Sequence, residues 1–251
     1  MIHVKKQLLP TLALGLVLFG CSSKNDSKET TAATQTTTAQ TTAGKTTEST
    51  RATSESKNTN STHSEEKKET TASNGMADTS LGYDIIVNKK HALPSNYSPG
   101  EDPTAAAQVK KLIRKMQELG YPISNTYSGY RSYDYQTQLY NNYVKQEGQA
   151  AADTYSARPG YSEHQTGLAF DILDSHGNLL EGPEYHDAIH WLHTHAHEYG
   201  FIIRFQPGKE AITGYQAEAW HLRYVGDKAT DIYQSGLSLE EYFGVPGGDY
   251  E

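Results

Sequence analysis

Apolar side chains are distributed unevenly along this 251-residue chain, and this distribution limits which part can fold. From position 22 to about position 80 the sequence is almost entirely Thr, Ser, Lys, Glu, Ala, Asn and Gln, and it contains no aromatic residue. Such a segment cannot bury enough apolar area to offset about 1–2 kcal/mol of backbone entropy per residue. We therefore expect residues 22–80 to form a disordered tether and residues 81–251 to form one compact domain.

The first 21 residues resemble a bacterial lipoprotein signal. Lys5 and Lys6 precede an apolar run from Leu8 to Phe19, which is too short to cross a bilayer comfortably. Cys21 follows at the position where such a signal is cut and the new terminal cysteine is lipidated; the alternative is a plain cleaved signal with an incidental cysteine. We expect a protein held by lipid at the extracellular face of the cell membrane of a Gram-positive bacterium, on the cell wall side.

Cysteine content and charge exclude several classes of function. Cys21 is the only cysteine, so the folded part can hold no disulfide, thiolate metal site or cysteine nucleophile. The formal net charge of −8 argues against nucleic acid as a partner. We expect a monomer.

Sequence patterns after position 100 predict helices interleaved with short strands. Asp102 and Pro103 begin a helix that Gly120 ends, and Ser238 with Glu241 forms a capping box for a last short helix. Further helices are expected from residue 133, over 149–155 and over 184–199, and strands over 123–130, 167–173, 201–205 and 220–225. This order predicts an α+β domain with a small, mostly antiparallel sheet flanked by helices.

Two segments, residues 162–171 and 218–223, contain the side chains that most specifically indicate a catalytic metal site. His164, Asp171 and His221 are the candidate ligands of a zinc ion. Three protein ligands with one open position describe a catalytic zinc centre, whereas a structural zinc fills all four positions with protein atoms. The two segments therefore predict an enzyme.

Hydrolysis at such a centre also needs a base that takes the proton of water. Glu218 lies three residues before His221 and is our candidate. Glu163, next to His164, is the competing candidate, although adjacent side chains of an extended segment point apart.

A second group of histidines offers a rival metal site. His186, His190, His193 and His197 recur at intervals of three and four residues on the helix predicted from residue 184. No glutamate lies between two of them as in the His-Glu-x-x-His pattern of zinc peptidases. We interpret them as a solvated helix face, and we expect His195 to pack inside.

The two segments also carry a family resemblance. The sequence from Ser162 to Asp171, SEHQTGLAFD, together with EAWHLR at 218–223, closely resembles the zinc carboxypeptidases of the VanY-like D-alanyl-D-alanine carboxypeptidase family. That family shares a superfamily with the hedgehog signalling domain, and the resemblance implies the corresponding fold. The match extends from Asp84 to about Tyr250 and is greatest to a streptococcal lipoprotein branch, whose members are L,D-carboxypeptidases of peptidoglycan.

The resemblance implies roles for individual residues. It makes His164, Asp171 and His221 the ligands of Zn²⁺ and Glu218 the catalytic base. The arginine, glutamine and serine that surround the substrate in the family correspond to Arg131, Gln136 and Ser162. For Arg131 the chemistry agrees, since a guanidinium can pair with a terminal carboxylate through two hydrogen bonds. A structural ion pair is the alternative for Arg131, and helix-face or loop roles are the alternatives for the other two.

The implied function is removal of the terminal D-alanine from peptidoglycan stem tetrapeptides, which leaves tripeptides. D,D-carboxypeptidase action on pentapeptides would use the same residues, so the motifs do not separate the two reactions. A third alternative is a murein-binding module that keeps the zinc without catalysis. The presence of Glu218 argues against this third alternative.

Overall fold

The computed structural model of the protein describes residues 75–250. The lipoprotein signal with Cys21 and nearly all of the predicted tether lie outside these residues. Within them, Met76 forms a bridge with Ala92, and Ala77 is buried in the hydrophobic core. The folded part thus includes residues 75–80, which the sequence analysis assigned to the tether.

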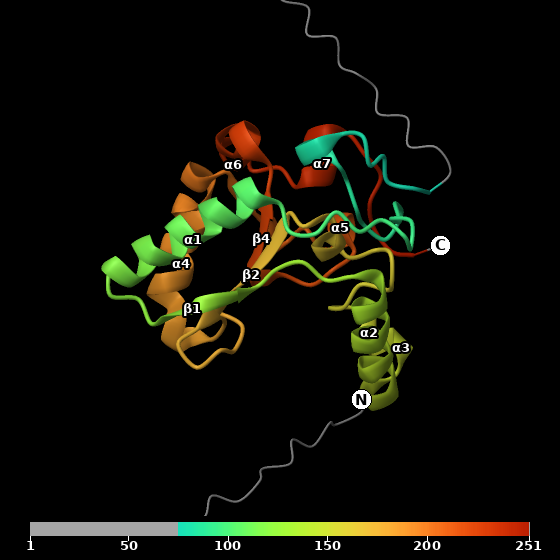
Figure 1. Ribbon diagram of the computed structural model, residues 1–251, viewed down its shortest axis with the longest axis horizontal. Coiled ribbons are helices and arrows are strands. Elements are labelled where there is room, and N and C mark those ends of the chain that lie inside the picture. The colour runs from blue at the N-terminus through green and yellow to red at the C-terminus, as the bar shows by residue number, and fades with distance from the viewer. Residues whose placement is uncertain (1–74, 251) are drawn as a thin grey trace, which may run out of the picture. The chain divides into compact units, whose positions relative to one another are not determined.

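The structure confirms the predicted α+β class (Figure 1). Four strands form one antiparallel sheet in the order β1-β2-β4-β3. The strands are β1 (Ile123–Ser128), β2 (Ala169–Asp174), β3 (Phe201–Phe205) and β4 (Glu218–Tyr224). The α-helices are α1 (Pro103–Glu118), α2 (Tyr133–Glu147), α3 (Gln149–Ala152), α4 (His186–His195), α5 (Glu210–Thr213), α6 (Ala229–Ser235) and α7 (Leu239–Phe243). Short 3-10 helices are η1 (Gly82–Asp84), η2 (Glu163–Thr166), η3 (Pro183–Tyr185), η4 (Ala196–Tyr199) and η5 (Gly226–Lys228).

Helix α1 forms as its sequence predicts. The Asp102 carboxylate accepts a hydrogen bond of 2.8 Å from the backbone N–H of Ala105, and Pro103 occupies the first turn. Such a cap stabilises a helix by about 1 kcal/mol. One face of α1 is buried through Val109, Leu112, Ile113 and Met116.

The core lies on one side of the central strands. Phe170 and Ile172 of β2 and Leu222 of β4 are fully buried in the same cluster as the apolar face of α1. Because side chains alternate along a strand, Asp171 and His221 point to the opposite side of the sheet. In Figure 1, α1 and α4 lie together at one side of the sheet, and α2 and α3 lie at the other.

The helix predicted over 184–199 is divided into three pieces, η3, α4 and η4. The final turn is the tighter 3-10 type and ends at Gly200, whose positive φ of 83° suits glycine. None of the helices in the described part of the chain is both long and apolar enough to span a bilayer.

Candidate metal centre

Strand pairing brings two of the three predicted ligands together. Asp171 of β2 and His221 of β4 are direct partners in the antiparallel ladder, and side chains so placed lie about 5 Å apart at Cβ. His164 comes from η2, which ends at Gly167 with a φ of 75°. A Cβ atom on Gly167 would collide with the carbonyl oxygen of Gly100, so glycine is required where the chain turns from η2 into β2.

The three side chains have the spacing of metal ligands. Oδ1 of Asp171 lies 3.3 Å from Nε2 of His164 and 3.3 Å from Nδ1 of His221. Tetrahedral coordination with bonds of 2.0–2.1 Å separates two ligand atoms by roughly 3.3 Å. Nε2 of His164 and Oδ1 of Asp171 are buried, and neither has a hydrogen-bond partner among residues 75–250. These residues therefore fit a bound zinc ion, and no other group of three or more potential ligands occurs in that range.

Electrostatics favour a cation at this point. Burial opposes the charged form of His221, but the carboxylates of Asp171, Glu163 and Glu218 outweigh it and hold the pKa of His221 well above its usual value. The three carboxylates around this imidazole thus favour a positive charge between them, either a proton on His221 or a metal ion. Burial lowers the pKa of His164 to about 4, which favours the neutral, metal-binding ring. Nδ1 of His164 donates to the carbonyl oxygen of Gly129 at 2.8 Å, leaving Nε2 available for a metal.

A register shift between β3 and β4 places Glu218 on the same side of the sheet as His221. Residues three apart in a regular strand point to opposite faces. Here Ile203 pairs with Leu222 and Phe205 pairs with Glu218, so two steps along β3 correspond to four along β4. The extra residues in β4 change the direction of the Glu218 side chain, so that it points to the same face as His221. Its Oε2 lies 3.3 Å from Nδ1 of His221.

The environment of Glu218 suits a proton acceptor. The side chain is buried, and this burial raises the pKa of its carboxyl above the ordinary value. A base whose pKa lies closer to neutrality transfers protons more efficiently. Glu218 can therefore take up and return a proton at the centre.

Glu163, the competing candidate for the base, is placed differently from the expectation. It lies in the 3-10 turn η2 rather than in an extended segment, and its side chain is buried. Its Oε1 accepts hydrogen bonds from Nε of Arg204 at 2.8 Å and from Nη1 of Arg223 at 2.9 Å. Burial opposes the charge, but the two arginines hold the pKa of Glu163 far below its usual value. A carboxylate so acidic is a poor base.

Arg131, Gln136 and Ser162 line the same pocket as the metal centre. Nη2 of Arg131 pairs with Oδ2 of Asp171 at 3.2 Å, and Nη1 donates to Oε1 of Gln136 at 3.3 Å. Arg131 thus makes the ion pair that the sequence analysis gave as its alternative role. Its Nε is nevertheless buried with no hydrogen-bond partner among residues 75–250, which leaves one donor for a ligand.

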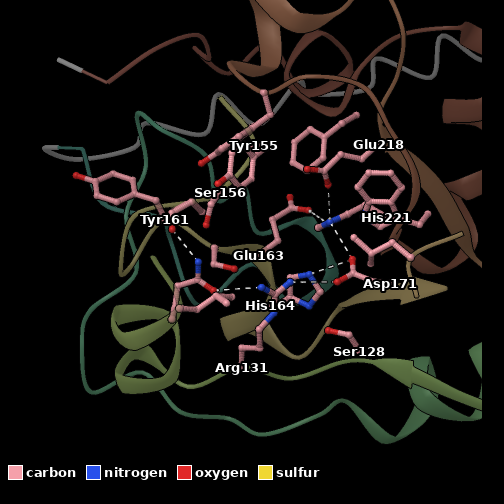
Figure 2. A pocket seen from close by; sticks show the side chains of 18 of the residues that line it. Ser128, Arg131, Tyr155, Ser156, Tyr161, Glu163, His164, Asp171, Glu218 and His221 are labelled. Carbon is pink, nitrogen blue, oxygen red and sulfur yellow. Dashed lines mark hydrogen bonds and ion pairs between the residues drawn. The ribbon is translucent and has the colours of Figure 1, made fainter. Parts of the chain in front are cut away.

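The pocket has a volume of about 510 Å³ and extends beyond the metal centre (Figure 2). Its additional lining contains several aromatic residues, among them Tyr135, Tyr143, Tyr155, Tyr161, Tyr215 and Trp220. These residues come from separate parts of the chain, so no local sequence pattern brings them together. A space of this size can hold a peptide of a few residues rather than a single amino acid.

The histidine-rich segment, residues 186–197, forms no comparable centre. His186 and His190 are exposed, and their rings stack with centroids 6.5 Å apart. The rest of the predicted solvated face is partly buried: Nε2 of His193 donates to the carbonyl oxygen of Ala219, and His197 stacks on Tyr233. His195 is also partly buried, stacked on Trp191 with centroids 4.5 Å apart.

Comparison with known proteins places the site in context. A family model described as VanY, D-alanyl-D-alanine carboxypeptidase, matches residues 99–227. A D-alanyl-D-alanine carboxypeptidase of Enterococcus faecalis is 36% identical over 63% of this chain. The match spans 64% of that enzyme, slightly less than two thirds of its length.

Two solved structures are also similar. An L,D-carboxypeptidase DacB from Streptococcus pneumoniae is 59% identical, with a TM-score of 0.64 over 66% of this chain and 89% of that one. A mutant of the vancomycin-resistance D,D-pentapeptidase VanY, in complex with Zn(II), is 34% identical, with a TM-score of 0.54 over 64% of this chain and 98% of that one.

Proposed function

Because this chain belongs to the VanY family of D-alanyl-D-alanine carboxypeptidases, we propose that it is a zinc-dependent L,D-carboxypeptidase. It removes the terminal D-alanine from peptidoglycan stem tetrapeptides and leaves tripeptides. The observation that carries the proposal is the convergence of His164, Asp171, His221 and Glu218 in one pocket. The choice of an L,D bond is supported by the 59% identity to the pneumococcal L,D-carboxypeptidase.

Zinc is the proposed metal because two imidazoles and one carboxylate are a donor set that zinc enzymes use. The Zn(II) complex of the related VanY enzyme supports this choice. When bound, zinc lowers the pKa of a coordinated water and polarises the carbonyl group of the substrate. Arg131 pairs with the outer oxygen of Asp171, which keeps the other oxygen directed to the centre.

Glu218 performs the proton transfers in this proposal. Its carboxylate takes the proton of the attacking water and then gives a proton to the leaving amine of D-alanine. Its burial supports this role because a raised pKa allows the same group to act as base and then as acid.

Arg131, Gln136 and Ser162 bind the carboxylate of the terminal D-alanine. The guanidinium supplies the charge that distinguishes a carboxypeptidase from an endopeptidase, since only a chain end carries a carboxylate there. Gln136 is buried, and its Nε2 donates to the carbonyl oxygen of Ala157 at 2.7 Å, which fixes its orientation beside Arg131.

The cellular setting belongs to the same proposal. Lipidation of Cys21 holds the enzyme at the extracellular face of the membrane of a Gram-positive bacterium. A flexible polar tether of about 60 residues has an average span of roughly 40 Å. The domain could then reach stem peptides in the cell wall.

A D,D-carboxypeptidase acting on pentapeptides is the second candidate. It is favoured by the family description and by the enzyme of Enterococcus faecalis, although both identity values for D,D enzymes given above are lower than that for the L,D-carboxypeptidase. The two activities require the same catalytic residues.

The discriminating experiment incubates the purified full-length chain with tetrapeptide and pentapeptide muropeptides and detects the products by mass spectrometry. Parallel samples contain a chelator, with and without added zinc. We expect D-alanine release from the tetrapeptide only, its loss with the chelator and its recovery with zinc. Release from the pentapeptide only would assign the D,D reaction, and release from neither would contradict a peptidase function.

A further inference from the structure

Two buried polar atoms face each other on the outer side of the metal centre. Nε2 of His221 and Oε2 of Glu163 are 3.5 Å apart. Each atom is buried, and neither has a hydrogen-bond partner among residues 75–250. Buried polar groups of native proteins are almost always paired, so these two atoms are each other's natural partners. Figure 2 shows the two side chains directed toward one another.

The other ring nitrogen of His221 is directed toward the centre. Nδ1 lies 3.3 Å from Oδ1 of Asp171 and 3.3 Å from Oε2 of Glu218. A neutral imidazole carries its proton on one nitrogen only, and a metal can bind only the nitrogen that lacks it. His221 can therefore serve as a ligand through Nδ1 only if Nε2 carries the proton.

Glu163 is held firmly in the position that would select this tautomer. Arg204 and Arg223, both fully buried, donate to its Oε1. Arg204 also donates to both carboxylate oxygens of buried Glu240, at 2.9 and 2.6 Å. If the carboxylate of Glu163 rotated away, the buried donors Nε of Arg204 and Nη1 of Arg223 would each lose their partner.

We propose that Glu163 is a positioning residue for the metal centre. Its Oε2 accepts the Nε2–H of His221, fixes the ring orientation and leaves Nδ1 free to bind the metal. This inference rests on the proposed zinc-dependent function. It assigns Glu163 a role in metal affinity instead of the role of base that the sequence left open.

The substitution Glu163→Gln tests the assignment at nearly constant volume. If the amide oxygen of the glutamine accepts from the two arginines, its NH₂ group faces Nε2 of His221 and favours the tautomer with the proton on Nδ1. If the amide is reversed, its oxygen still accepts from Nε2 of His221, but its NH₂ group faces the donors of Arg204 and Arg223, which is an unfavourable contact. We expect a 10- to 100-fold loss of zinc affinity, measured by competition with a chromophoric chelator.

Glu240→Gln is the matched control. It removes the same charge from the same arginine network, but the hydrogen bonds of Glu240 are with Arg204 and Asn88, whereas the ion pairs of His221 are with other carboxylates. We expect this variant to unfold at a lower temperature and to bind zinc within about threefold of the wild type. Equal loss of zinc affinity in both variants would assign Glu163 a merely structural role and overturn the proposal, as would wild-type affinity in Glu163→Gln.

A measurement on the wild type keeps the proposal testable if Glu163→Gln does not fold. In the zinc-loaded protein with ¹⁵N-labelled histidine, NMR should show a slowly exchanging ring proton on Nε2 of His221. A ring proton on Nδ1 instead would contradict the proposal. If the wild type bound no zinc at all, the proposed zinc-dependent function would be contradicted. If Glu163→Gln instead bound zinc and released D-alanine like the wild type, only the inference about Glu163 would be contradicted.

Discussion

The metal centre and the histidine-rich segment 186–197 both offer imidazoles at spacings that could bind a metal, but the structure treats them differently. In the centre, His164 and His221 are buried with their rings 5.0 Å apart and share the carboxylate of Asp171. In the segment, His186 and His190 lie at the surface, while His193 already donates to a backbone carbonyl. Only the first region provides buried, unpaired ligand atoms that converge.

Pairing between distant segments therefore matters more for a metal site than the local density of histidines. The other two ligands lie 50 and 57 positions before His221; the ladder between β2 and β4 brings Asp171 to His221, and η2, just before β2, carries His164. Helical spacing places His186 and His190 near each other, and Oδ1 of Asp187 lies 3.2 Å from Nδ1 of His186, but all three residues are exposed. A metal site needs charge and burial as well as proximity.

The most severe test of the comparison removes one ligand from each region. Asp171→Asn should abolish zinc binding and reduce D-alanine release to background, because it removes the negative charge of the carboxylate whose Oδ1 lies 3.3 Å from a nitrogen of each imidazole. His190→Ala should leave both unchanged, since His190 is exposed. Metal analysis and mass spectrometry of the products measure the two effects; loss of zinc in His190→Ala would reverse our assignment.

Glu218→Gln separates metal binding from chemistry within the centre. We expect the variant to retain zinc, because Glu218 is not a ligand here, and to lose about 10²- to 10⁴-fold in kcat through the missing base. The readout is steady-state release of D-alanine at saturating tetrapeptide. A variant with full activity would show that another group moves the proton.

Arg131→Lys sharpens the distinction between a metal site and a carboxypeptidase site. Lysine keeps the charge but cannot form two parallel hydrogen bonds to a carboxylate. We expect kcat/KM for the tetrapeptide to fall about 10- to 100-fold. Arg114→Lys on the exposed face of α1 is the control and should match the wild type. An unchanged kcat/KM in Arg131→Lys would indicate that the ion pair with Asp171 is the main role of Arg131.

The smallest expected effect concerns the pH dependence of stability in the histidine-rich segment. Burial lowers the pKa of His193, so the unfolded chain binds more protons than the folded protein below pH 6.5. Stability should therefore be fully present above pH 6.5 and decline as the pH falls toward 5. His193→Gln, which keeps a donor for the carbonyl of Ala219, should flatten this decline. Urea unfolding of both proteins at pH 5, 6 and 7 gives the free energy of unfolding at each pH. If this free energy declined equally in the variant and the wild type, a buried, neutral His193 would be contradicted.

Much of the site could be predicted from the sequence, because the types of its residues alone indicate the chemistry that they can perform. Two histidines, an aspartate and a glutamate suggest a catalytic metal before any fold is known. Glu218 was the predicted base, but the way in which its side chain comes to face the centre could not be predicted, because it depends on a register shift that pairs two steps of β3 with four of β4. Regular alternation would have placed Glu218 on the opposite face from His221.

The position of Glu163 was hidden for a similar reason. Its partners Arg204 and Arg223 lie 41 and 60 residues further along the chain. The sequence also gives no sign that η2 is a tight turn rather than an extended segment. Pairing over such distances depends on the tertiary structure, whereas the helix cap at Asp102 and the burial of one face of α1 follow from local patterns.

We propose that the convergent cluster, and not the histidine-rich segment, holds the catalytic metal. Diffraction from crystals of the zinc-loaded protein, measured at the zinc absorption edge, locates the metal. We expect one anomalous peak between His164, Asp171 and His221, with Nδ1 as the ligand atom of His221. A peak between His186 and His190 with none at the cluster would contradict it.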